Sequence, residues 1–370
     1  MAAAPQKGGK ITSKIPPFCY AGLMNSLKLP FLAKLNFGPQ DAAALRHLGK
    51  CQGRQQLYVK QRPETLEKLR TVAMVESTDA SNRIEGITAP KARVEALVQQ
   101  TTEPKNRSEQ EIAGYRRALD LIHDGSTDIP IKANIVRQLH KAMYSYMSED
   151  GGEWKITDNE IVEKDSEGNI TRVRFKAVSS VATPQAMEDL FNNYHQALEN
   201  KYDPLVAVPL AILDFLCIHP FTDGNGRVGR LLTLLMLYHA DYQVGRYISL
   251  ERLVDDSRKS YYQTLEASSQ GWHEGKHDAM PWITYFWGIL TRAYKEFEER
   301  VGDVDAGRGS KSKRVRDAVN RKMSTFKVVE IERDCPDISR DTIRAVLREM
   351  KKEGLVKAEG RGPGARWRIL

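Results

Sequence analysis

This 370-residue sequence has few cysteines, no long apolar run and no apolar signal segment at its start. The strongest apolar run, residues 205–218, is shorter than the roughly 20 residues of a membrane helix and contains Asp214. We therefore expect no membrane span and no export, and a cytoplasmic location. The four cysteines have no metal-ligand spacing and suit reduced thiols; they are Cys19, Cys51, Cys217 and Cys335.

The positive charge of the sequence is concentrated at its C-terminal end. Residues 310–370 hold 17 Lys and Arg against 9 Asp and Glu, a surplus of 8 that equals the net charge of the whole chain. Such an asymmetry predicts a separate basic module. The Gly- and Ser-rich residues 302–312 indicate a linker before it. We therefore expect an N-terminal region 1–105, a helical core 106–301, this linker and a C-terminal domain 313–370.

Apolar residues at helical spacing predict a mainly α fold. One stretch differs: over residues 161–175 the period changes to two, with a turn at 166–169. A lone β-hairpin is marginal in water, so we expect this one to lie across the helical body as a flap. The predicted helices cover residues 41–48, 63–85, 108–123, 131–147, 184–198, 205–218, 231–237, 257–268 and 281–300.

The C-terminal domain shows three predicted helices, 313–323, 328–334 and 343–353, followed by two strands. This order is typical of a winged helix-turn-helix. Basic residues on the third helix and the wing form a footprint that suits duplex DNA, although the same surface also suits protein docking or plain solvation. These residues are Arg340, Arg344, Arg348, Lys351, Lys352, Arg361, Arg366 and Arg368.

A polar stretch of twelve residues, 219–230, separates the two most apolar predicted helices, so it should be a loop held by a rigid core. In the turn Gly224-Asn225-Gly226, backbone N–H groups can converge on an anion, and the following helix adds the positive end of its dipole. Arg227 and Arg230 lie three apart and should project to one side of that helix. Two guanidiniums beside such a turn suit a polyphosphate.

Two further residues of this stretch suit phosphoryl or nucleotidyl transfer. Asp223 is a candidate ligand for Mg²⁺, which needs only one or two carboxylates in addition to phosphate oxygens. His219 is the group able to take a proton near neutral pH. Without a function, the stretch would be a Gly-rich turn with His219 as a satisfied helix-end residue. A zinc site is disfavoured because no third ligand lies nearby in sequence.

The stretch resembles the signature of the Fic (filamentation induced by cAMP) family, His-Pro-Phe-x-Asp/Glu-Gly-Asn-Gly-Arg-x-x-Arg, at every specified position. The resemblance extends over about residues 60–300 and includes the hairpin and the pair Tyr261-Tyr262. It implies a helical Fic core that transfers AMP from ATP, with Mg²⁺, to a Ser, Thr or Tyr hydroxyl of a protein. A C-terminal winged helix is similar to that of the SoFic-like bacterial adenylyltransferases.

The resemblance also implies roles for individual residues. His219 would be the general base, and Phe221 a core anchor. The flap positions would be Lys176, Val178 and Ser179, where the family pattern is only weakly matched. Ser269 stands where the family often has Asn beside the adenine. The residues implied to bind ATP are Asp223, which also holds the metal, Gly224, Asn225, Gly226, Arg227, Val228, Gly229, Arg230, Tyr261 and Ser269.

The segment Ser81-x-x-x-Glu85-Gly86 ends a predicted helix, and a carboxylate is unfavourable there because it faces the negative end of the helix dipole. By itself Glu85 could be an ordinary exposed acid. The resemblance gives it a role, since Ser81, Glu85 and Gly86 match the family's inhibitory motif. This implies that Glu85 pairs with Arg230, occupies the γ-phosphate position and restrains the enzyme.

Several functions stay open at this point. One is an adenylyltransferase that modifies target proteins and itself; another is a DNA-binding regulator whose core acts mainly on itself. In some relatives the same glutamate positions a water that removes AMP. Transfer of phosphate or phosphocholine is a weaker alternative, since relatives of that kind depart from the full signature. A homodimer is also left open.

Overall fold

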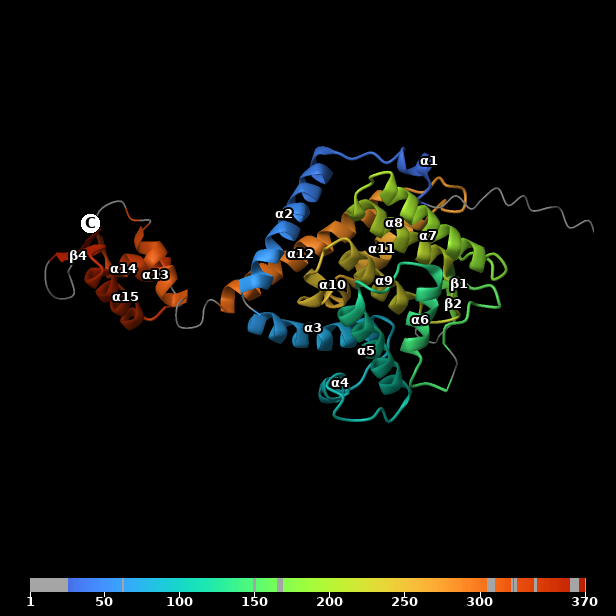
Figure 1. Cartoon of the computed structure of the whole chain (residues 1–370), viewed down its shortest axis with the longest axis horizontal. Helices are drawn as coiled ribbons and strands as arrows, with labels where there is room; N and C mark the ends of the chain where they lie inside the picture. The colour runs from blue at the N-terminus through green and yellow to red at the C-terminus, as the bar shows by residue number, and fades with distance from the viewer. Residues whose placement is uncertain are drawn as a thin grey trace, which may run out of the picture.

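The computed structural model describes residues 26–61, 63–148, 151–164, 169–304, 310–320, 322, 325–335, 338–359 and 366–369. Most of these residues are helical, as predicted (Figure 1). No helix in this part of the chain is long and apolar enough to cross a membrane. The helices of the larger body are α1 Leu29–Leu32, α2 Pro39–Gln61, α3 Pro63–Ile84, α4 Lys91–Val98, α5 Arg107–Gly125, α6 Ala133–Met143, α7 Thr183–Glu199, α8 Pro204–Ile218, α9 Asn225–His239, the 3-10 helix Val244–Arg246, α10 Leu250–Asp256, α11 Arg258–Ser269 and α12 Met280–Val304.

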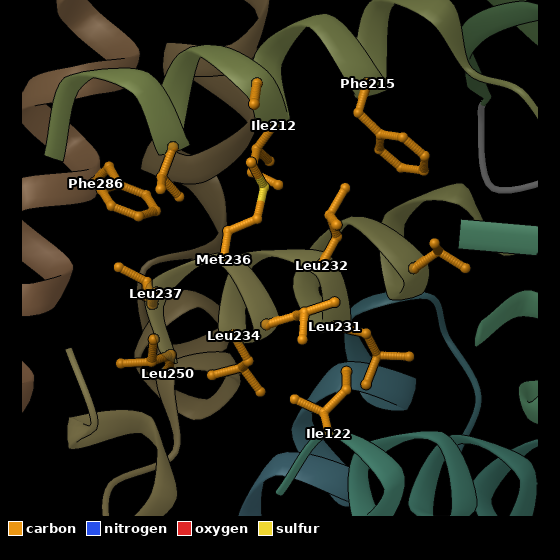
Figure 2. Close-up of a cluster of buried hydrophobic side chains, with 14 of the residues drawn as sticks. Ile122, Ile212, Phe215, Leu231, Leu232, Leu234, Met236, Leu237, Leu250 and Phe286 are labelled. Carbon is orange, nitrogen blue, oxygen red and sulfur yellow. The ribbon is translucent and has the colours of Figure 1, made fainter. Parts of the chain in front are cut away.

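The core of the body is built on α8 and α9. Helix α8 is buried on all its faces because nearly every residue in it is apolar. Side chains of both helices meet in Figure 2, where Ile212 and Phe215 face Leu232 and Met236. Helices α7, α11 and α12 also pack against α8, and α3, α5 and α6 pack against α9. The loop between α8 and α9 therefore joins two helices that are almost wholly buried.

The predicted hairpin is present as β1, Glu160–Lys164, paired antiparallel with β2, Ile170–Lys176. Its register runs from Glu160 opposite Lys176 to Lys164 opposite Ile170. Strand β2 contacts α11, so the hairpin lies against the helical body as the sequence predicted. Most of the predicted turn, residues 166–168, lies outside the described residues.

The C-terminal part has its own core, which shares no residue with the first. It contains α13 Ser310–Asn320, β3 Thr325–Lys327, α14 Val328–Asp334, α15 Arg340–Lys352, β4 Val356–Glu359 and β5 Arg366–Ile369. The sheet is three-stranded and antiparallel, in the order β3-β5-β4, whereas the sequence predicted only two strands. The winged helix-turn-helix assignment stays a prediction.

Some predicted boundaries are wrong. The short helix 41–48 is part of the first half of α2, which continues through Gly49 and Gly53 because it packs along α12. Tertiary packing outweighs the helix-breaking tendency of two glycines. The predicted helix 131–147 ends at Met143, and α4 and α10 were not predicted. At the predicted linker 302–312, α12 extends to Val304 and α13 begins at Ser310; residues 305–309 lie outside the described part.

Candidate active site

His219 ends α8 in the left-handed conformation, with φ 52° and ψ 60°. Its Nδ1 lies 3.2 Å from the carbonyl oxygen of Leu216. Because a carbonyl only accepts, we assign the proton to Nδ1, which leaves the lone pair on Nε2. Burial lowers the pKa of His219 to about 4, so the ring is neutral near pH 7. His219 lines a cavity, and its free nitrogen can act there as a proton acceptor.

The loop after His219 is braced by its own residues. Asn225 accepts the backbone N–H of Phe221 at 2.9 Å, and its amide donates to the Phe221 carbonyl at 2.8 Å. Phe221 is fully buried, as predicted for an anchor, and stacks on His140 with ring centroids 3.9 Å apart. Gly224 has φ 76°, and a Cβ there would lie 2.7 Å from Met143 Cε. The Gly-Asn-Gly turn is thus a fixed shape at the start of α9.

Asp223 is fixed by hydrogen bonds from α6 and its C-cap residue, while its carboxylate stays exposed. Its carboxylate is 67% exposed and accepts the Tyr144 hydroxyl at 3.2 Å. The Gly152 N–H donates to Nδ1 of His140, so the other ring nitrogen, Nε2, donates to the Asp223 carbonyl at 3.2 Å. Burial lowers the pKa of His140 to about 4 and keeps this arrangement neutral. An exposed carboxylate on a fixed loop fits one ligand of a Mg²⁺ ion that also binds phosphate oxygens.

Arg227 is buried on α9 against α5. Its side chain is 1% exposed, and Nη1 pairs with Glu111 of α5 at 2.6 Å. The second amino group lies 3.4 Å from the Asp223 carboxylate. Arg227 is not among the residues that line the cavity, so the binding of one anion by both arginines stays a prediction. The buried carboxylate of Glu111 draws Arg227 away, and nothing local in the sequence marks that partner.

Arg230, in contrast, lines the cavity and holds the end of α3. It donates to the Ser81 hydroxyl at 2.8 Å, to the Ser81 carbonyl at 2.9 Å and to Glu85 Oε1 at 2.7 Å. Among the described residues, Nη1 has no hydrogen-bond partner. A Cβ on Gly226 would collide with Glu85 Oε1. Gly86, with φ 81°, ends α3 and turns the chain away.

The cavity has a volume of about 350 Å³ and two unlike ends. Its polar end contains His219, Gly226, Arg230 and Glu85. Its other walls come from α8, α11 and the hairpin, and most of them were not predicted. These wall residues are Leu213, Leu216 and Cys217 of α8, Tyr261, Tyr262, Leu265, Glu266 and Ser269 of α11, and Ile161, Val162, Arg174 and Phe175 of the hairpin.

Of the residues assigned to nucleotide binding outside the loop, Tyr261 and Ser269 do line the cavity, and Ser269 donates its hydroxyl to the Glu266 carbonyl at 3.0 Å. Val228 does not line the cavity, because its side chain is fully buried in the core. Gly229 packs against Phe215 and Leu216, because its side of α9 faces α8 rather than the loop.

The predicted flap residues lie at the base of the hairpin instead of over the cavity. Val178 is buried, and its N–H lies 3.4 Å from the Cys217 carbonyl. Lys176 and Ser179 are exposed. The strand residues that face the cavity precede them, and only the alternation of side chains across β1 and β2 could have marked those positions.

Residues 130–237 match the model of the Fic/DOC family. Over this stretch the chain is similar to proteins of the Fic/DOC family. Protein adenylyltransferase fic-1 of Caenorhabditis elegans is 27% identical over 112 residues, which cover 30% of this chain and only 20% of that protein's length. The chain is thus distantly similar to fic-1 over about a fifth of that protein's length.

Solved structures share the fold of the chain. A Fic family protein from Desulfovibrio desulfuricans matches with a TM-score of 0.60 at 21% identity, over 91% of this chain and 97% of that one. A Fic domain containing signaling protein from Bacteroides thetaiotaomicron matches with a TM-score of 0.56 at 19% identity, over 70% of this chain and 98% of that one. Fic-1 from C. elegans matches with a TM-score of 0.55 at 17% identity, over 72% of this chain and 74% of that one.

Proposed function

We propose that this chain is a protein adenylyltransferase, which transfers AMP from ATP to a Ser, Thr or Tyr hydroxyl of a protein, including its own. The observation that carries the proposal is the pairing of two groups in one cavity. His219 offers a neutral, unprotonated nitrogen, and Arg230 offers a buried guanidinium with a free amino group. A base and an anion donor in one apolar-walled pocket suit attack on a phosphate. The distant similarity to fic-1 supports the same reaction.

In this reaction His219 Nε2 takes the proton of the target hydroxyl. The hydroxyl oxygen forms a bond to the α-phosphorus of ATP, and the bond from that phosphorus to the bridging oxygen breaks. Pyrophosphate leaves with the electron pair. The apolar wall of α8 and the side chains of Tyr262 and Leu265 would bind the adenine ring of ATP. Arg230 would face the outer phosphates.

Asp223 would hold the Mg²⁺ ion, because its carboxylate is exposed and fixed by Tyr144 and the neighbouring loop. When bound, such an ion neutralises charge on the phosphates. Arg227 contributes indirectly, since its guanidinium lies beside Asp223 and is itself held by Glu111.

Glu85 restrains this site. Its carboxylate neutralises Arg230 at 2.7 Å and lies directly over Gly226, within the cavity. A phosphate that approached Arg230 would have to displace a carboxylate of like charge. The resting protein is therefore expected to bind ATP in a way that does not favour transfer, and removal of Glu85 is expected to release it.

The test uses ATP labelled at the α-phosphate and the full chain. Glu85→Gly should incorporate at least about tenfold more label than the parent, because the competing carboxylate is gone. His219→Ala in the Glu85→Gly background should incorporate none. ATP labelled at the γ-phosphate serves as the control for phosphate transfer. Equal labelling of parent and Glu85→Gly would contradict the restraint, and label that persists without His219 would contradict the mechanism.

Removal of AMP by the same site is a second candidate. Glu85 is 31% exposed in the cavity and could orient a water. Protein first labelled by the Glu85→Gly variant can be isolated and mixed with unlabelled parent. Release of AMP that depends on Glu85 would show the reverse reaction.

A further inference from the structure

A buried lysine lies behind the loop that carries His219. Lys155, between α6 and β1, is 3% exposed. Its Nζ donates to the Ile218 carbonyl at 3.0 Å and to the Asn159 side chain at 2.8 Å. Among the described residues no carboxylate lies within ion-pair distance of its Nζ, although the charge of Asp158 acts on it, and Lys155 does not line the cavity. A buried ammonium is costly, so its main contact, a loop carbonyl, calls for an explanation.

The five residues from Lys155 to Asn159 donate to four consecutive carbonyls, from the last residue of α8 to Phe221. The Lys155 backbone N–H donates to the Pro220 carbonyl at 2.9 Å. The Asn159 amide donates to the Phe221 carbonyl at 3.0 Å. The Asn159 amide also lies 3.5 Å from the His219 carbonyl, so with the contact to Ile218 the peptide groups on both sides of His219 are held by this segment. The segment is itself anchored, because Asp158 accepts the N–H of Ser180 at 2.7 Å and its hydroxyl at 2.9 Å.

This fixing matters because His219 has an unusual backbone. A non-glycine residue in the left-handed region is strained and persists only where its surroundings hold it. The Ile218 carbonyl belongs to the peptide that enters His219, so a donor on that oxygen opposes rotation of the peptide. A cation at the C-terminal end of α8 also interacts favourably with the helix dipole. The Nδ1 contact of His219 with Leu216 depends on the same backbone turn.

We propose that Lys155 and Asn159 are positioning residues, which hold the loop carbonyls so that His219 presents its free Nε2 to the cavity. The inference rests on the proposed function, in which that nitrogen takes the proton of the target hydroxyl. Neither residue lines the cavity. Their loss should therefore reduce turnover while leaving the binding of ATP nearly intact.

The kinetic test is made in the Glu85→Gly background, with Lys155→Met and Asn159→Asp. The second variant keeps the shape of the side chain but cannot donate to Phe221. Each should lower kcat by about 10- to 100-fold, the scale expected from a misplaced catalytic group, with a change in KM for ATP of less than about threefold. Lys295→Met, an exposed lysine of α12, is the matched control and should change neither. A loss no larger than that of the control, or a loss confined to KM, would overturn the proposal.

A second measurement does not require activity. In protein with ¹⁵N-labelled histidine, identified by comparison with His219→Ala, the parent should show His219 as a single tautomer protonated at Nδ1. Lys155→Met and Asn159→Asp should show a mixture of tautomers. Unchanged spectra in both variants would overturn the positioning role. Absence of label transfer in Glu85→Gly itself would instead refute the proposed function, and the spectra would still decide the role of Lys155.

Discussion

Arg227 and Arg230 lie one turn apart on α9, and both are buried and paired with a glutamate from another helix. Arg227 pairs with Glu111 of α5 at 2.6 Å, and Arg230 with Glu85 of α3 at 2.7 Å. Their surroundings differ: the Glu111 side chain is 9% exposed and does not line the cavity, whereas Glu85 is 31% exposed and lines it. The first pair braces the fold and the second occupies a site. A buried Arg–Glu ion pair can thus stabilise the fold or block a site, depending on whether it lies beside a cavity.

The largest expected effect comes from breaking the brace. Arg227→Met leaves Glu111 buried without its main partner, which should cost about 3–5 kcal/mol in the free energy of unfolding. Urea denaturation followed by circular dichroism measures this. Arg107→Met removes an exposed partner of the same glutamate and should cost less than about 1 kcal/mol. Equal costs would show that the two contacts on Glu111 are equivalent.

Acid should lower the free energy of unfolding through two buried histidines. His140, behind Asp223, and His219 both have a pKa lowered to about 4 by burial, against the ordinary 6.5. The unfolded chain therefore binds more protons between pH 6.5 and 4, and stability falls as the pH is lowered through that range. From pH 7 to pH 5 the loss should be about 2 kcal/mol for a buried histidine such as His140. His140→Leu should reduce this pH slope, whatever its effect at pH 7.

One buried acid acts in the opposite direction. Burial raises the pKa of Asp214 to about 6 from its ordinary 3.8, so the folded state takes up a proton that the unfolded state does not. Its contribution stabilises the protein as the pH falls and partly offsets the histidines. Unfolding curves at pH 7, 6 and 5 for the parent and Asp214→Asn separate the two effects. A parent protein with the same stability at all three values would contradict the histidine prediction.

The contact between Gly226 and Glu85 gives a smaller, coupled effect. Gly226→Ala should cost about 1–2 kcal/mol in the parent, because its Cβ collides with the Glu85 carboxylate. In Glu85→Gly the same change should cost about 1 kcal/mol less. A double-mutant cycle of unfolding free energies measures the coupling. Additive costs would place Glu85 away from Gly226 in solution.

The smallest effect concerns the basic C-terminal part. We propose that α15 binds duplex DNA. Its arginines differ in whether they form an ion pair within the protein. Arg340 pairs with Glu332 at 3.0 Å, while Arg344 is exposed and has no ion pair among the described residues. Arg344→Ala should reduce the slope of log affinity against log salt by about one, and Arg340→Ala by less. A parent slope near zero would contradict DNA binding. Arg361 lies outside the described residues.

The sequence predicted the features that depend on neighbours along the chain. Periodicity of apolar residues located most of the helices, and the change of period located the hairpin. The braced loop from His219 to Arg230 was visible because its parts are contiguous. Residues that meet from distant segments were not visible: nothing in the sequence joins Glu111 to Arg227, or Lys155 to Ile218. The resemblance to a family pointed to Glu85 and Arg230, a pair that local sequence alone would have left unrelated.

The sequence by itself therefore determined which groups are present at the α8–α9 loop and which shape the loop takes, since apolar helices on both sides and the Gly-Asn-Gly turn are local properties. Tertiary structure decided which of those groups line the cavity. Two arginines three residues apart on one helix are equivalent in sequence. They diverge because one meets a buried carboxylate of α5 and the other meets α3 at the edge of a cavity.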